Sequence, residues 1–184
     1  MKTGAWIFGI LSILFVIYLL VGLFLPGTWE TEVEAVVPAP PSRTFPFLSD
    51  PGAWSQWSPM PEAGATTFGA PRGEGAGLRW DDPRYGRGEL RILATRTDEM
   101  VEYRVEVEGG ALRIHGTMTL DPVEGGTRIR WKESGDFGWN PLLGYAARRM
   151  GESQGLAMEE SLETLSRILE GSLPDSLPVP PIDP

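Results

Sequence analysis

Few side chains in this sequence are suited to acid–base chemistry. His115 is the single histidine of the chain, and an imidazole exchanges protons near neutral pH. It follows Ile114 in an alternating segment, so it faces solvent if Ile114 faces the core. Glu133 and Asp136, at the end of the last alternating segment, are the other candidates for a general acid or base.

The composition excludes several kinds of site and partner. The absence of cysteine rules out disulfides, thiolate zinc sites and cysteine nucleophiles, and one histidine cannot form a multi-histidine metal site. No G-x-S-x-G motif is present to carry a Ser–His–Asp arrangement. The formal net charge of −9 repels a phosphate backbone. We therefore expect no metal, no cofactor and no nucleic-acid partner.

The N-terminal region is long and apolar enough to cross a bilayer. Residues 5–25 carry no charge, and a helix of this length spans the hydrocarbon core of ~30 Å. Trp6 and Trp29 lie at its two ends, as in an interfacial aromatic belt. No small-x-small cleavage pattern follows it. Residues 1–27 are therefore predicted to form an uncleaved transmembrane anchor.

Charges beside this segment favour one orientation. Lys2 precedes it, and Glu30, Glu32 and Glu34 follow it. The positive-inside tendency keeps the short N-terminus in the cytoplasm. The sequence thus predicts a single-pass membrane protein whose domain is extracytoplasmic.

Residues 28–171 show the pattern of an α+β domain. An alternating strand over 30–37 is followed by two short helices, over 42–48 and from Asp50 to Trp57. Glycine pairs then separate further alternating segments, which indicates an antiparallel meander with one covered face and one wet face. These predicted strands cover residues 66–68, 78–80, 90–94, 101–107, 112–120 and 129–131.

A long amphipathic helix is predicted to cover the sheet. It starts at Asn140-Pro141 and ends at Gly171. Gly151 and Gly155 lie beside its apolar stripe, although each costs up to ~1 kcal/mol relative to alanine. They indicate room for a ligand or a close approach to the sheet, with a kink as the alternative. Residues 172–184 form a proline-rich tail.

Several motifs in this order resemble one superfamily. They are FPFLSDPGAWSQWSP over residues 45–59, Gly75-Ala-Gly77 with Trp80, Gly86-Arg-Gly88-Glu89, GGTRIRW over 125–131 and Asn140-Pro141. The chain resembles the SRPBCC, START-like or helix-grip superfamily, and within it the polyketide cyclase/dehydrase and lipid-transport group. The resemblance covers about residues 30–170. It implies a seven-stranded antiparallel sheet wrapped around a long C-terminal helix, with two short helices after the first strand.

The resemblance also implies an apolar cavity between the sheet and the helix. The inward residues expected to bind a ligand are Trp54, Trp57, Trp80, Tyr103, Met118 and Trp131, together with Gly151 and Gly155. Ordinary core packing is the alternative for these aromatic residues. Glu133 and Asp136 would then lie near the cavity mouth.

Three functions follow as hypotheses. The first is a membrane-tethered module that binds a hydrophobic small molecule or lipid without turning it over, because few catalytic side chains are present. The second is a cyclase or dehydratase acting on a polyketide-like or aromatic substrate. The third is a protein-interaction domain that displays the sheet or the tail.

Overall fold

The computed structural model describes residues 2–61, 64–138 and 143–171. An apolar helix, α1 (Lys2–Phe24), precedes an α+β domain that ends with the long helix α3 (Gly144–Gly171). Between them lie α2 (Pro41–Leu48), the short 3₁₀ helices η1 (Pro51–Gln56) and η2 (Glu108–Gly110), and seven strands. The strands are β1 (Thr28–Val37), β2 (Thr66–Phe68), β3 (Gly77–Asp82), β4 (Gly86–Arg96), β5 (Met100–Val107), β6 (Leu112–Val123) and β7 (Gly126–Asp136).

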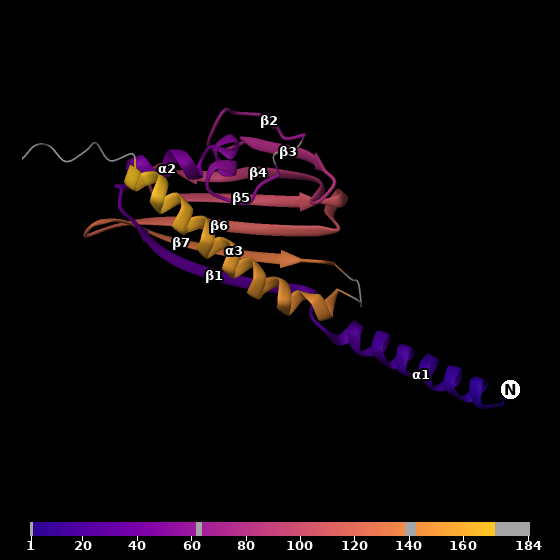
Figure 1. The fold of residues 1–184 in the computed structure, drawn as a ribbon. Helices are drawn as coiled ribbons and strands as arrows, with labels where there is room; N and C mark the ends of the chain where they lie inside the picture. Colours follow the sequence, from indigo (N-terminus) through magenta and orange to yellow (C-terminus); the bar gives the residue numbers. More distant parts are fainter. Residues whose placement is uncertain (1, 62–63, 139–142, 172–184) are drawn as a thin grey trace, which may run out of the picture.

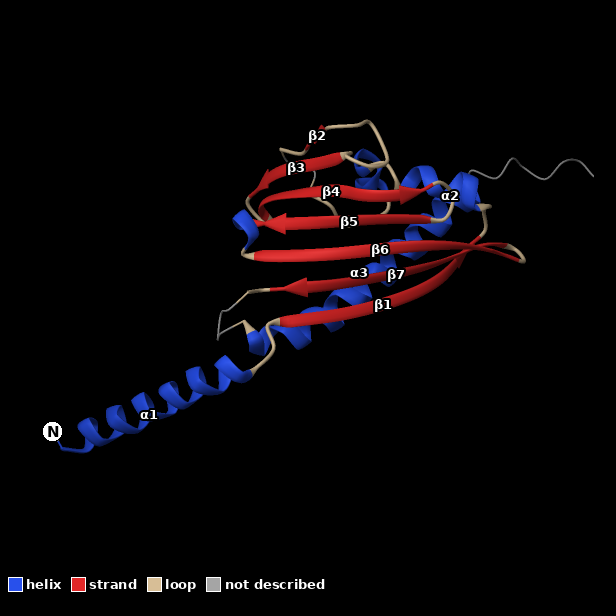
Figure 2. Cartoon of the chain, turned by 180° about the vertical axis from the view of Figure 1, so that it is seen from behind, coloured by secondary structure: helices blue, strands red, loops and turns tan. Residues whose placement is uncertain are grey.

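The strands form one antiparallel sheet in the order β1-β7-β6-β5-β4-β3-β2. Helix α3 runs obliquely across one face of this sheet, and α2 and η1 lie on the same side (Figure 1). None of the described helices covers the opposite face (Figure 2). The predicted helix-grip fold is therefore confirmed.

Alternating burial along the strands produces the core. On β7, Ile129, Trp131 and Glu133 are buried while the residues between them point outward. The apolar stripe of α3 supplies the facing layer, with Met158, Leu162, Leu165 and Leu169 at the sequence spacing of a helix face. Both layers follow the two periodicities of the sequence.

Three aromatic side chains on the inner face lie over glycines of the neighbouring strand. The pairs are Trp29 with Gly135, Trp80 with Gly88, and Tyr103 with Gly116. A Cβ atom added at any of these glycines would lie within 2.5 Å of the ring. Glycine is required there because the ring occupies the space of the missing side chain.

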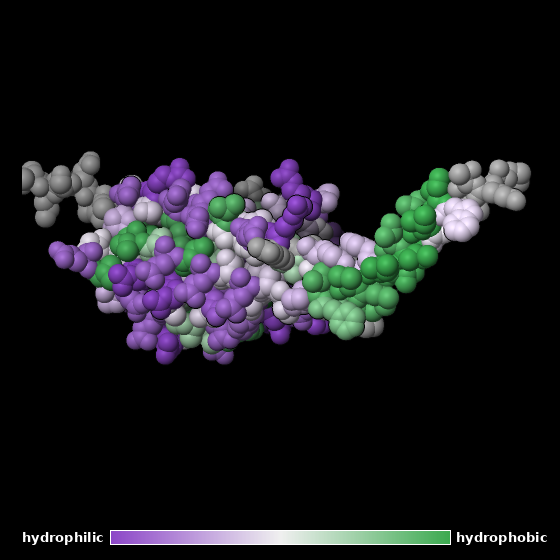
Figure 3. Space-filling view, turned by 90° about the horizontal axis from the view of Figure 1, so that it is seen from below, coloured by the Kyte–Doolittle hydropathy of each residue, from purple (hydrophilic) through white to green (hydrophobic). Residues whose placement is uncertain are grey.

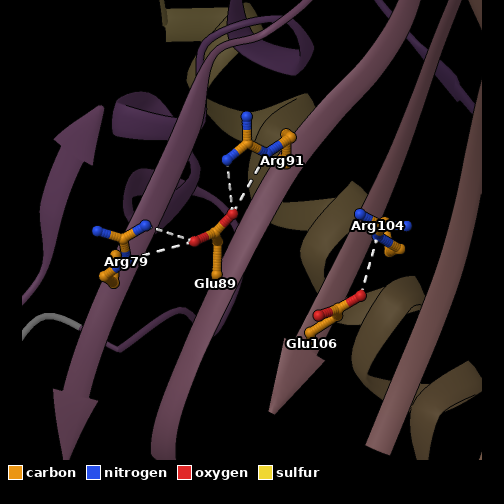
Figure 4. Close-up of polar contacts among 5 residues, drawn as sticks. All are labelled: Arg79, Glu89, Arg91, Arg104 and Glu106. Carbon is orange, nitrogen blue, oxygen red and sulfur yellow. Dashed lines mark hydrogen bonds and ion pairs between the residues drawn. The ribbon is translucent and has the colours of Figure 1, made fainter. Parts of the chain in front are cut away.

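The outer face is covered by charged side chains that pair with one another. Glu89 accepts from Arg79 at 2.6 Å and from Arg91 at 2.9 Å, and Arg104 lies 3.3 Å from Glu106 (Figure 4). Such exposed pairs contribute little individually. Together they give the outer face of these strands a largely charged surface.

Helix α1 projects from the domain and exposes apolar side chains all around (Figure 3). It is long and apolar enough to span a membrane. Its C-terminal part contacts the start of α3, where the Tyr18 and Tyr145 rings stack at 4.4 Å between centroids. The Tyr145 hydroxyl also donates to the carbonyl oxygen of Tyr18 at 2.8 Å.

The predicted element boundaries need small corrections. Strand β1 begins at Thr28, two residues before the predicted start, because Thr28 and Trp29 pair with the end of β7. The second short helix is a 3₁₀ helix, and the Asp50 side chain caps it by accepting from the Gly52 amide at 3.0 Å. The predicted helix start at Asn140-Pro141 and the predicted tail over 172–184 lie outside the described residues.

Candidate functional site

A cavity of about 390 Å³ lies between the inner face of the sheet and α3. The segment from Ser58 to Pro61 closes one side, and the end of β5 and the start of β6 form part of its rim. Most of the lining is apolar or aromatic. The lining residues that carry the argument below are Trp54, Trp80, Tyr103, Trp131, Glu133 and Gln154.

Strand register places a tyrosine and a glutamate side by side across three strands. Tyr103 on β5 pairs with Gly116 on β6, and Gly116 pairs with Glu133 on β7. Because Gly116 has no side chain, the Tyr103 ring extends over it and its hydroxyl donates to a Glu133 carboxylate oxygen. One missing side chain thus brings two polar groups together in the core.

Further hydrogen bonds complete a buried network. The indole Nε1 of Trp131 donates to the Tyr103 hydroxyl oxygen at 2.7 Å, which leaves the hydroxyl hydrogen free for Glu133. Gln154 on α3 donates from Nε2 to the other Glu133 oxygen at 2.8 Å. Glu133 is only 4% exposed. The network therefore holds a buried carboxyl group by two donors at the cavity wall.

Burial sets the protonation of both groups. It raises the pKa of Glu133, although the hydrogen bonds from Tyr103 and Gln154 oppose this effect. Burial and the charge of Glu133 raise the pKa of Tyr103 well above its usual value, so its hydroxyl stays protonated. A raised carboxyl pKa inside a pocket is a property of functional sites.

The raised pKa makes a prediction about stability. A carboxyl group whose folded-state pKa is raised stabilises the fold fully below its unfolded pKa of about 4.5, and this contribution is lost as pH rises through the raised pKa. We expect Glu133→Gln to be more stable than the wild type at neutral pH. The difference in the free energy of unfolding between the variant and the wild type should shrink by up to about 1.4 kcal/mol per pH unit as the pH falls toward 4.5. Urea unfolding across pH measures it.

Glu89 provides a control of opposite sign. Burial raises its pKa, but hydrogen bonds from Arg79 and Arg91 outweigh burial and lower it. Glu89→Gln should therefore lose stability relative to the wild type above pH 4.5, and this loss should disappear in acid. Equal pH profiles for the two variants would contradict the assignment of Glu133.

The remaining tryptophans have different roles. Trp54 lines the cavity, donates from Nε1 to the Leu48 carbonyl oxygen at 3.0 Å and meets the Tyr103 ring edge-on at 4.8 Å. Trp57 lies behind the cavity wall, where it contacts the Trp131 ring at 5.6 Å. Trp80 lines the cavity, and its buried Nε1 finds no hydrogen-bond partner among the described residues. Met118 is fully buried in the core and does not line the cavity.

The two helix glycines lie away from the cavity. A Cβ atom on Gly151 would lie 3.6 Å from the Trp29 Cβ atom, and one on Gly155 would lie 2.9 Å from the Thr31 hydroxyl oxygen. Both glycines therefore face β1. This position corresponds to the close approach of helix and sheet that the sequence indicated beside a ligand contact, and neither glycine lines the cavity of about 390 Å³.

Two of the three acid–base candidates lie on the outer face. His115 is exposed there, and its Nε2 lies 3.1 Å from a Glu102 oxygen. Asp136 is also exposed and accepts from the Gly138 amide at 2.7 Å. Neither residue lines the cavity, because both occupy strand positions whose side chains point to the outer face. Of the three candidates, only Glu133 lines the cavity. Glu133 lies in the cavity wall and not merely near the mouth.

Comparison with known proteins identifies the family. Residues 28–170 match the family model described as polyketide cyclase/dehydrase and lipid transport. The chain belongs to this family. The match covers the α+β domain of this family member and leaves α1 outside. A comparison with curated protein sequences finds no match.

Solved structures share the fold of the family member. Protein MLL2253 from Mesorhizobium loti is 22% identical, with a TM-score of 0.59 over 78% of this chain and 98% of that one. SA2116 from Staphylococcus aureus is 15% identical, with a TM-score of 0.60 over 79% and 95%. DynU16, a protein of the dynemicin biosynthetic locus, is 18% identical, with a TM-score of 0.56 over 77% and 47%.

Sequence reasoning missed several polar residues that line this family member's cavity, and Gln154 is the one that belongs to the hydrogen-bond network. Gln154 lies four residues from both Met150 and Met158, so it occupies a position on the apolar stripe of α3. A polar residue within an apolar stripe can indicate a buried polar contact, so the sequence pattern contained a signal for Gln154. The rim residues from Ser58 to Pro61 carry no comparable signal, because an irregular segment has no periodicity.

Proposed function

We propose that this protein binds a hydrophobic small molecule or lipid in the cavity without turning it over, while α1 tethers the domain to a membrane. One observation carries the binding proposal: an apolar cavity of about 390 Å³ has the buried network of Tyr103, Glu133 and Gln154 in its wall. Pockets for small organic ligands commonly have ~300–1,000 Å³ and a few fixed polar groups. The family model, which covers lipid transport, supports the same class of ligand.

The position of the cavity rim supports a membrane-tethered binder. The rim includes Tyr85, Val107 and Leu112, which lie at the β3–β4 and β5–β6 turns. Helix α1 leaves the domain from this same end of the sheet (Figures 1 and 2). A tethered domain would hold the rim toward the bilayer, with the N-terminus in the cytoplasm and the domain outside it.

Filling the cavity should abolish binding. Ala157 is half-buried on α3 and lines the cavity, so Ala157→Phe would place an aromatic ring inside it. We expect the affinity for an environment-sensitive naphthalene dye to fall at least about tenfold, because a filled cavity excludes the probe. Dye fluorescence titrated with the full chain in zwitterionic nanodiscs measures this loss.

The neighbouring residue supplies a matched control. Leu156 is 68% exposed on α3 and does not line the cavity, so Leu156→Phe should leave dye affinity unchanged. Equal affinity of the dye for the wild type and Ala157→Phe would overturn the proposal of a binding cavity.

One observation favours an enzyme of the cyclase or dehydratase type as a second candidate. The buried Glu133 carboxyl group, with its raised pKa, is the kind of group that transfers a proton to a bound carbonyl or hydroxyl. Separate substitutions discriminate the two functions. Chemical conversion of a bound compound that is lost in Glu133→Gln and retained in His115→Ala would favour the enzyme.

A further inference from the structure

Glu133 differs from the acidic residues of the outer face in its surroundings. Each of five outer acids has a basic partner within 3.3 Å: Glu30 with Lys132, Glu34 with Arg128, Glu89 with Arg79, Glu102 with His115, and Glu106 with Arg104. Within the described part of the chain, Glu133 has no such partner, and none of the described lining residues is Lys, Arg or His. The cavity thus contains an acid without a cation.

The hydrogen bonds around Glu133 suit the ionised form. Tyr103 and Gln154 both donate to it, one to each carboxylate oxygen. Trp131 fixes the direction of the Tyr103 donor by occupying the hydroxyl oxygen. A carboxylate oxygen accepts more than one hydrogen bond, so acceptor capacity remains for a ligand. The network therefore presents an acceptor and not a donor.

The walls around this acceptor are aromatic. Trp54, Trp80, Tyr103 and Trp131 line the same cavity. The face of an indole or phenol ring attracts a cation by its quadrupole, most strongly where water is excluded. The chain already uses this interaction on its outer face, where Arg79 and Arg91 each lie 4.8 Å from the Phe68 ring centroid.

We propose that the cavity takes hydrophobic ligands that carry a protonated amine, and that Glu133 receives the ammonium group among the aromatic side chains. This inference rests on the proposed binding function and names its ligand class. An ammonium group supplies both the missing countercharge and the hydrogen-bond donor. The net charge of −9 favours the approach of a cation.

Three probes with one skeleton test the ligand class. Equilibrium dialysis of 1-naphthylmethylamine, 1-naphthylmethanol and 1-naphthoic acid against the full chain in zwitterionic nanodiscs, with empty nanodiscs subtracted, gives the three affinities. We expect the amine to bind at least about tenfold more tightly than the alcohol and the acid more weakly than both. An alcohol that binds as tightly as the amine would overturn the inference.

The Glu133→Gln variant tests the residue. Glutamine keeps the shape of the side chain and accepts from Tyr103, and the Gln154 amide can rotate to accept from it. We expect amine affinity to fall to that of the alcohol, with alcohol binding retained as proof of an intact cavity. Glu102→Gln, on the outer face, should keep the preference for the amine. A preference that survives in Glu133→Gln would refute the role of Glu133.

The pH dependence provides a test with a definite sign. The elements around Glu133 contribute Tyr103, Gly116, Thr31 and Gln154, of which only Tyr103 titrates, and its hydroxyl stays protonated. Amine affinity should rise as the pH increases above about 4.5, because Glu133, whose pKa is raised by burial, then becomes ionised. An affinity that falls over this range would indicate a protonated Glu133 that donates to a neutral ligand. If none of the three probes binds and Ala157→Phe leaves the dye affinity unchanged, the proposed binding function is refuted. If the probes bind without a preference for the amine, only the proposed ligand class is refuted.

Discussion

Gly116→Val should destabilise the domain by about 2–6 kcal/mol. A Cβ atom at this position would overlap the Tyr103 ring, which lies directly over the glycine. Overpacking of a core commonly costs ~1–3 kcal/mol, and the displaced ring would also leave Glu133 and Trp131 without the Tyr103 hydroxyl, at a further ~1–3 kcal/mol. The sum is a large part of the stability of an ordinary domain. Urea unfolding followed by tryptophan fluorescence measures it.

Another glycine separates this steric effect from the general effect of a substitution. Gly171 at the end of α3 has no heavy atom within 4 Å of an added Cβ atom. Gly171→Ala should change the free energy of unfolding by less than about 0.5 kcal/mol. If Gly116→Val also left the free energy of unfolding unchanged, the packing of the Tyr103 ring over a glycine would not be required for stability.

Removal of residues 1–27 should transfer the protein completely from the membrane fraction to the soluble fraction. Helix α1 is exposed along its length and has no polar face. Its leucine, isoleucine, phenylalanine and valine residues each contribute roughly 0.3–0.6 kcal/mol to insertion. The full chain should stay in the pellet after an alkaline carbonate wash, while the shortened chain appears in the supernatant.

Two measurements control this experiment. The intact mass of the membrane-bound protein should include residues 1–27, because a cleaved leader would be lost. The chain has no cysteine, so a single Glu124→Cys in the exposed β6–β7 turn reports the side of the domain. Labelling of intact cells by an impermeant maleimide is expected; protection of the cysteine would contradict an extracytoplasmic domain.

The sequence pattern predicts much of the fold, because alternation along the strands (parity) and the helical period determine which side chains are buried. Ile129 and Trp131 have inward parity, and Glu133 continues the same series. The position of this acid in the wall is therefore readable from the alternation. The outward position of His115 follows in the same way from Ile114 and Met118, and the structure agrees.

Parity does not reveal which buried residues face an empty space. Met118 and Trp131 lie opposite each other in β6 and β7, yet only Trp131 lines the cavity. Whether an inward residue lines the cavity depends on where α3 and the segment from Ser58 to Pro61 lie over the sheet, and alternation along a strand does not encode this. The position of Gly151 against Trp29 likewise depends on how closely α3 approaches β1.

The rings that lie over glycines also protect the sheet against misassembly. Strands that slip by two residues keep their apolar face inward, so hydrophobicity alone does not prevent that error. A two-residue slip between β5 and β6 would press the Tyr103 ring onto Ile114 or Met118 instead of Gly116. A slip between β1 and β7 would move Trp29 from Gly135 onto Glu133 or Phe137. Each ring and its glycine therefore favour one alignment of two strands, which matters most for β1 and β7 because these two strands are distant in the chain.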